Sequence, residues 1–198
     1  CFAKFLHDEG LTNQIRLVVD TGSRLIQLDI KDDWQVVVDM GPPDFEPSLL
    51  PFDAQEEAKI YQLEVAGEIV EFSAISMGNP HVVLLVDDIN AAPVDRLGPA
   101  IERHSRFPER TNVGFASPIT RSKIRLRVWE RGVGETSACG SGACAAVVAC
   151  HRLGWVDDDI AVELPGGIAS VRWPGQGSVF VRGPAVTVYR GEIDPDAL

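Results

Sequence analysis

The same local pattern, an apolar helix that ends at a glycine, occurs twice in this chain. One copy, CFAKFLHDEGL, begins at Cys1, and the other, AAVVACHRLGW, begins at Ala145. Both end in His, two further residues, Gly and a large apolar residue. Gly10 and Gly154 therefore fit the left-handed residue that commonly terminates a helix, with the next residue as its hydrophobic contact.

Each predicted helix is followed by a β-rich run with a glycine turn inside it. The runs begin at Ile15 and Ile160, and the turns fall seven residues later, at Gly22 and Gly167. A helix, a cap and a hairpin repeated in one order and at similar separation indicate a duplicated lobe. The second copy has CGSGA directly before its helix, whereas the first copy shows no equivalent turn.

Most of the remaining sequence also favours strands. Residues Lys123–Trp129 alternate polar and apolar, as a half-buried strand does, and Ser178–Gly191 reads as a further strand pair. Residues Asp88–His104 are predicted to be helical, with an interruption at Gly98-Pro99. The acidic, proline-rich stretch Pro42–Glu57 is predicted to be a surface connection between two units.

Composition excludes several classes of partner. The chain has 198 residues and a formal net charge of −11, which disfavours nucleic acid and anionic membranes because both require a basic face. The longest strongly apolar run, Ala143–Cys150, is far shorter than the ~20 residues of a membrane span. We therefore expect neither a nucleic-acid nor a membrane partner.

The cysteines and histidines indicate a reducing compartment and no metal. None of the four cysteines forms a C-x-x-C pair, so free thiols in the cytoplasm are predicted. The four histidines show no metal-ligand spacing, so no zinc or other metal site is expected.

One thiol stands at the expected start of the second helix. Cys139 precedes Gly140-Ser141-Gly142, and helix-start amides together with the helix dipole favour an anion. A thiolate there is expected to have a lowered pKa and to act as a base or nucleophile. The alternative is that Cys139 is a small buried residue, as Cys144 and Cys150 are predicted to be.

The same glycines also match a dinucleotide-binding fingerprint, G-x-G-x-x-A, from Gly140 to Ala145. That motif requires a strand running directly into the glycines. Here the predicted strand ends at Trp129, and ERGVGETSA intervenes before Cys139 and the glycines. A Rossmann site is therefore disfavoured.

Two further stretches carry candidate polar groups. Asn79 and His81 lie in GNPH, directly before a buried strand, where a plain turn is the alternative. Glu130 and Arg131 lie at the end of a strand, where Arg131 could clamp a carboxylate with two hydrogen bonds. The alternative for this pair is a surface ion pair.

Together these blocks resemble the diaminopimelate epimerase family. The matching stretches are MGNPHVVLLVDDI, RFPERTNVGF, ERGVGETSACGSGACAAV, ELPGG and GPAVTVY, in the family's order. The resemblance covers essentially the whole chain, and the block around Cys139 is its most specific part.

The resemblance implies an α+β fold of two pseudo-symmetric lobes, each a β-barrel-like sheet around a central helix. It implies a cofactor-independent isomerase that interconverts LL- and meso-diaminopimelate, a small amino-acid substrate of lysine and peptidoglycan synthesis. Two cysteines, one at the start of each central helix, would move a proton on opposite faces of the α-carbon. A proline or hydroxyproline racemase, or a phenazine-type isomerase, remains the alternative on the same scaffold.

The resemblance also assigns site residues. Cys139 would be the catalytic acid/base, His81 and Glu130 would tune the thiols, and the substrate would be bound by Asn79, Asn112, Glu130, Arg131, Gly140 and Ser141.

The first lobe is expected to be incomplete, because the family's first catalytic-cysteine turn has no counterpart and Cys1 matches a helix position. The expected partial N-terminal lobe comprises residues 1–39 plus 185–198, with a closing strand from Ala185, and the C-terminal lobe comprises residues 40–184. Phe2, Phe5 and Leu6 should then be uncovered. The chain is expected to be an inactive fragment, and the full-length protein a homodimer.

Overall fold

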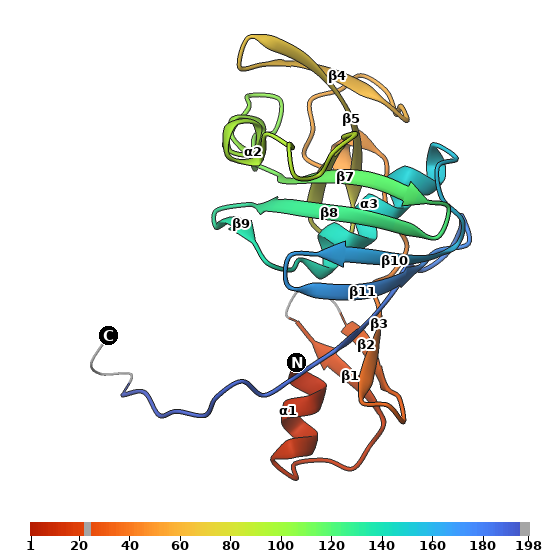
Figure 1. Cartoon of the computed structure of the whole chain (residues 1–198), viewed down its shortest axis with the longest axis vertical. Helices are drawn as coiled ribbons and strands as arrows, with labels where there is room; N and C mark the ends of the chain where they lie inside the picture. The colour runs from red at the N-terminus through yellow and green to blue at the C-terminus, as the bar shows by residue number, and fades with distance from the viewer. Residues whose placement is uncertain (22–24, 195–198) are drawn as a thin grey trace.

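The structure is a computed structural model that describes residues 1–21 and 25–194 (Figure 1). Its elements are α1 (Phe2–Asp8), β1 (Arg16–Asp20), β2 (Leu25–Ile30), β3 (Gln35–Asp39), the 3-10 helix η1 (Pro47–Leu49), β4 (Tyr61–Val65), β5 (Glu68–Ser76), β6 (Pro80–Leu85), α2 (Val94–Glu102), β7 (Asn112–Thr120), β8 (Lys123–Glu130), β9 (Gly134–Thr136), α3 (Gly140–Arg152), β10 (Asp159–Leu164), β11 (Gly167–Arg172) and β12 (Phe180–Pro184).

The strands form one long sheet, in the order β1-β2-β3-β12-β11-β10-β8-β7-β6-β5-β4, with β9 beside β8. Neighbouring strands are antiparallel except at β8/β10 and β6/β7. In the described chain β1 and β4 are the edges, so the sheet wraps without closing. The predicted α+β class and barrel-like sheet are confirmed in this open form.

Helix α3 lies inside the curve of this sheet and contacts strands β5 to β8 and β10 to β12 (Figure 1). Its residues from Ala143 to Cys150 are small or β-branched and at most 1% exposed, so the strands can approach closely. This confirms the predicted central helix and the core assignment of Cys144 and Cys150. Burial raises the pKa of the Cys150 thiol to about 12.

A second apolar core lies on the opposite face of the sheet, under α2. It contains an aromatic cluster in which Phe52 stacks on Phe107 and makes an edge contact with Tyr61. The stretch 42–57, predicted to be a surface connection, is mostly exposed or half-buried, but Leu50 and Phe52 are only 1% and 5% exposed. Its apolar residues contribute to this core.

Helix α2 is shorter and more continuous than predicted. It begins at Val94, and Pro99 lies within it without interrupting it. Gly98 is required there because an added Cβ would lie 2.7 Å from Cγ of Trp129. Gly98 therefore lets the helix pack closely against β8.

The two predicted glycine caps are confirmed. Gly10 and Gly154 have φ of 65° and 79°. The following amides, of Leu11 and Trp155, each donate to the carbonyl five residues earlier. These two side chains are 65% and 57% exposed, so their expected hydrophobic contact is at most slight. The predicted turn at Gly167 joins β10 to β11, while the one at Gly22 lies outside the described residues.

Helix α1 packs on β1 to β3 around a small core of Ala3, Ile30 and Val36. Phe2 and Phe5 are 52% and 54% exposed, which confirms the prediction that they are uncovered, whereas Leu6 is half-buried. A hollow of about 360 Å³ opens beside this helix.

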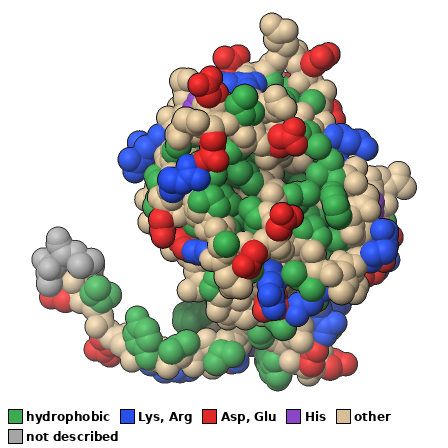
Figure 2. Space-filling model, turned by 45° about the horizontal axis from the view of Figure 1, so that its top comes forward, with side chains coloured by type: hydrophobic (Ala, Val, Ile, Leu, Met, Phe, Trp, Pro, Cys, Tyr) green, Lys and Arg blue, Asp and Glu red, His purple; other side chains and the backbone are tan. Residues whose placement is uncertain are grey.

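The predicted closing strand from Ala185 is wrong. Strand β12 ends at Pro184, and residues 185–194 leave the sheet without regular structure (Figures 1 and 2). They pass beside α1, where the Thr187 hydroxyl donates to Asp8 and Arg190 pairs with Glu9. Val186, Val188 and Tyr189 are exposed along this tail because they have no sheet neighbour to pack on. Strand β12 pairs with both β3 and β11, so the sheet crosses the predicted lobe boundary, and the domain division stays a prediction.

No helix in the described part of the chain combines the length and apolar character that a membrane crossing requires.

Candidate active site

Three strand ends meet at one end of the sheet and carry three of the predicted site residues. The register of the parallel pair β6/β7 places His81 beside Asn112. In the antiparallel pair β7/β8, Val113 lies opposite Trp129, which brings Glu130 level with Asn112. An imidazole, an amide and a carboxylate therefore stand on three adjacent strands.

These three side chains point to the face of the sheet that α3 covers. Each lies an even number of residues along its strand from a residue packed around α3, at Val83, Ala116 or Val128. Side chains two residues apart share a face of a sheet. The same face meets Cys139, the residue before the first turn of α3.

Cys139 is held at this helix start by its own sulfur. Its Sγ accepts a hydrogen bond from the Gly142 amide at 3.4 Å and lies 3.7 Å from the Ser141 hydroxyl oxygen. A Cβ at Gly142 would come within 3.1 Å of this Sγ, whereas one at Gly140 would meet nothing within 4 Å. The backbone is therefore packed against the sulfur at Gly142 and open at Gly140.

The predicted lowering of the thiol's pKa is wrong. Cys139 is only 6% exposed, and burial raises the pKa of its thiol. The Gly142 amide opposes this shift, but the nearby negative charge of Glu130 adds to it. Desolvation of the thiolate outweighs the helix-start hydrogen bond, so Cys139 is a neutral thiol at neutral pH.

Glu130 is half-buried and has a partner that sequence reasoning missed. The hydroxyl of Thr136 on β9 donates to its Oε1 at 2.5 Å. Thr136 lies opposite Val128, so it shares the face of Glu130. The sequence could have indicated this contact only if the pairing of β9 (Gly134–Thr136) with β8 had been known.

Replacing Glu130 with glutamine should lower the pKa of the Cys139 thiol, because it removes a negative charge that raises this pKa. The measurement is thiolate absorbance as a function of pH. Subtracting the curve of a Glu130→Gln/Cys139→Ser variant from that of Glu130→Gln isolates the titration of Cys139. Glu135→Gln is the matched control, since Glu135 pairs with Arg127 on the other face of β8. An unchanged pKa in Glu130→Gln would contradict the assigned influence of Glu130.

His81 is buried and uncharged. It is 1% exposed, and burial, with a smaller contribution from the positive charge of Arg131, lowers its pKa to about 3. Its Nε2 lies 3.1 Å from Oδ1 of Asn79, the half-buried residue of the preceding turn. Since this oxygen can only accept, the imidazole donates through Nε2.

Asn112 and Arg131 are joined through the backbone. The Asn112 side chain donates to the Pro80 carbonyl at 2.8 Å and accepts from the Arg131 amide at 3.0 Å. The exposed Arg131 guanidinium donates through Nη1 to the Glu109 carbonyl at 3.1 Å. Asn112 therefore organises the backbone, while Arg131 presents a cation at the surface.

All the predicted site residues thus gather where β6, β7 and β8 meet the start of α3. The set is Asn79, His81, Asn112, Glu130, Arg131, Cys139, Gly140 and Ser141. The open amides at the helix start can hold an anion, the thiol can move a proton, and the guanidinium can bind a second carboxylate.

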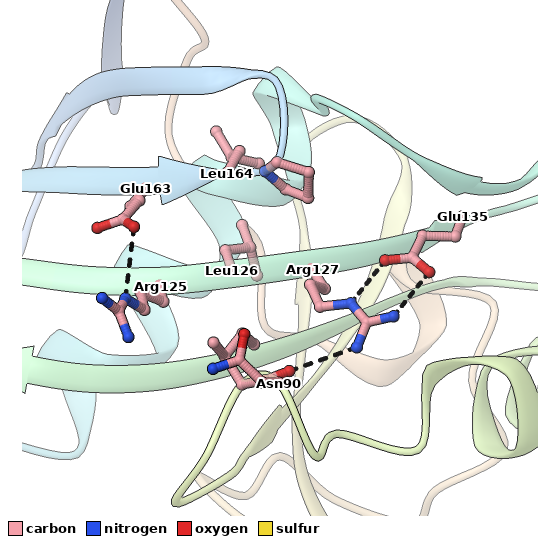
Figure 3. A pocket seen from close by; sticks show the side chains of 9 residues that line it. Asn90, Arg125, Leu126, Arg127, Glu135, Glu163 and Leu164 are labelled. Carbon is pink, nitrogen blue, oxygen red and sulfur yellow. Dashed lines mark hydrogen bonds and ion pairs between the residues drawn. The ribbon is translucent and has the colours of Figure 1, made fainter.

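A separate hollow of about 580 Å³ lies on the opposite face of the sheet (Figure 3). The Arg127 guanidinium there is held by both oxygens of Glu135, at 2.7 and 2.9 Å. Nε of Arg125 lies 3.4 Å from Oε1 of Glu163. The arginines and glutamates of this hollow therefore form ion pairs with each other. The residues that line it include no thiol or imidazole. The Cys139 side of the sheet is therefore the stronger candidate.

Comparison with known proteins gives consistent results. A family model described as diaminopimelate epimerase matches residues 73–188. The chain is 55% identical over 194 residues to the diaminopimelate epimerase of Pseudomonas savastanoi pv. phaseolicola, covering 98% of this chain and 70% of that protein. The diaminopimelate epimerase of Azotobacter vinelandii is 54% identical over the same shares.

Two solved structures share the fold. A probable proline racemase from Agrobacterium radiobacter superimposes with a TM-score of 0.68 at 17% identity, over 98% of this chain and 66% of that chain. A hydroxyproline epimerase from Agrobacterium vitis gives 0.64 at 18% identity, over 93% and 62%. At these identities the likeness concerns the fold alone.

Proposed function

The chain belongs to the diaminopimelate epimerase family, and on this premise we propose that the protein carrying it interconverts LL- and meso-diaminopimelate by proton transfer at the α-carbon. The observation that carries the proposal is the Cys139 thiol at the start of α3, on the face shared with Glu130. The product would serve lysine and peptidoglycan synthesis, and a cytoplasmic homodimer is the expectation for the full-length protein.

In this proposal the helix start binds the reacting end of the substrate. The exposed backbone at Gly140 and the amide of Ser141 hold the α-carboxylate, where the positive end of the helix dipole favours an anion. This places the α-carbon near the Cys139 sulfur. Arg131, exposed at the end of β8, binds the carboxylate at the distal end.

Cys139 serves first as the acid. Because its pKa is raised, the resting side chain carries a proton, which it delivers to one face of the α-carbon. A base on the opposite face must remove the original proton, and the family resemblance assigns that role to a second thiol in the other lobe. In the reverse reaction the Cys139 thiolate acts as the base. The negative charge of Glu130 destabilises this thiolate and so favours its protonation.

The test is α-hydrogen exchange catalysed by the full product of the gene that encodes this chain. Incubated with LL-diaminopimelate in deuterated water, it should yield the meso form carrying one deuterium at the inverted carbon. Proline and hydroxyproline, assayed in parallel, should not exchange. Exchange of proline without exchange of diaminopimelate would reverse the assignment in favour of a proline racemase.

A further inference from the structure

A buried carboxylate supports the site from outside it. Glu102, the last residue of α2, is 1% exposed. Its Oε2 accepts from the Trp129 indole at 2.8 Å, and its Oε1 accepts from the Gly132 amide at 2.9 Å. Burying a charged group is costly unless it is hydrogen-bonded, and here both oxygens are used.

The Gly132 amide belongs to the turn that presents Arg131. The Val133 amide donates to the Glu130 carbonyl at 3.1 Å, which closes a turn with Arg131 and Gly132 at its centre. Gly132 has φ of 76°, as the third residue of a type II turn requires. Glu102 therefore holds the central peptide unit of this turn.

The same carboxylate also reaches the segment on which the Arg131 guanidinium rests. Nη1 of Arg110 lies 3.8 Å from Oε1 of Glu102, and Arg110 has a left-handed φ of 61°. The preceding residue, Glu109, provides the carbonyl that accepts from the Arg131 side chain. One acidic group thus contacts both the backbone beside Arg131 and the segment that orients its side chain.

The carboxylate is ionised and rigidly placed. Burial acts to raise its pKa, but the hydrogen bonds from Trp129 and Gly132, with the charges of Arg103 and Arg110, bring the pKa below its usual value. The close contact of Gly98 with Trp129 fixes α2 against β8. The position of the acceptor is therefore set by the packing of the helix.

We propose that Glu102 is a positioning residue that fixes the turn at Arg131–Gly132 and so aims the Arg131 guanidinium at the distal carboxylate of the substrate. This inference rests on the proposed function for the identity of the substrate. The contact between Glu102 and the turn does not depend on it.

The first test measures kinetics in the full gene product. Glu102→Gln keeps the size of the side chain but replaces one acceptor with a donor, and one of the two N–H groups then loses its partner. We expect KM for diaminopimelate to rise roughly tenfold, with kcat changed less than about twofold, because Arg131 binds the part of the substrate that does not react. Glu64→Gln, an exposed change of equal charge on β4, should leave both unchanged.

A double-mutant cycle separates positioning from general destabilisation. In an Arg131→Ala background, Glu102→Gln should raise KM by less than about twofold, because there is no guanidinium left to aim. If the two substitutions instead multiply their effects on KM, Glu102 does not act through Arg131, and the proposal is overturned.

A second test uses the wild-type protein and does not depend on enzymatic activity or on the folding of a variant. Hydrogen exchange of the Gly132 amide in the wild-type protein should be slowed roughly ten- to hundredfold by the bond to Glu102, although the residue is exposed. Fast exchange of this amide overturns the proposal. If the wild-type protein does not turn over diaminopimelate but the Gly132 amide is protected, the proposed function fails while the contact of Glu102 with the turn stands.

Discussion

Substitution of Cys139 with alanine is expected to lower the rate of epimerisation by the full gene product about 10²- to 10⁴-fold, which is the usual contribution of a positioned acid or base. The thiol lies at the start of α3 on the face shared with Glu130, where the proposal places the α-carbon. The measurement is the rate of deuterium incorporation from solvent during conversion of LL- to meso-diaminopimelate.

Cys150→Ala provides the matched control. This thiol lies in the same helix, is fully buried, and packs among the apolar residues around α3. Its loss should lower stability modestly while the rate of epimerisation stays near that of the wild type. Comparable losses of activity in both variants would show that the effect arises from helix packing and would remove Cys139 from the mechanism.

The second large effect concerns the 198 residues by themselves. We expect them to show no useful epimerisation, because inversion needs groups on both faces of the α-carbon and only Cys139 matches a catalytic position. Cys1 is exposed and directly precedes α1. Loss of one member of a pair that acts as a unit removes most of the rate.

The comparison is made with the Pseudomonas savastanoi epimerase, assayed side by side with the 198 residues in deuterated water. The relative should convert LL- to meso-diaminopimelate, and the 198 residues should not. Comparable conversion by both would show that a second thiol is dispensable and would contradict the two-base assignment.

Local features of the fold could be predicted because they depend on short stretches of chain. Gly10 and Gly154 end their helices in the left-handed conformation, as their spacing from the apolar patterns predicted. The alternation along β8 matches its burial. The place of Cys139 directly before α3 followed from a glycine-rich turn and an apolar run. In each case the cause lies within a few residues of the effect.

Features that depend on distant neighbours could not be predicted in this way. The proline at Pro99 is tolerated inside α2, where the neighbouring Gly98 packs against Trp129. Residues 185–194 have the alternating pattern of a strand, but they form none because no neighbouring strand pairs with them in the described structure. Propensity describes what a segment can form, and tertiary contacts decide whether it does.

The sequence by itself determined that a helix starts at Cys139, because a glycine-rich turn and an apolar run are properties of the chain. Its resemblance to a family supplied the residues of the candidate site. Only the tertiary structure decided their protonation and support. It buries the Cys139 thiol beside Glu130 and so raises a pKa that the helix start alone would lower. It also brings Glu102 to the turn at Gly132, 30 residues away along the chain. Desolvation and long-range contacts depend on what surrounds a side chain, and folding alone sets those surroundings.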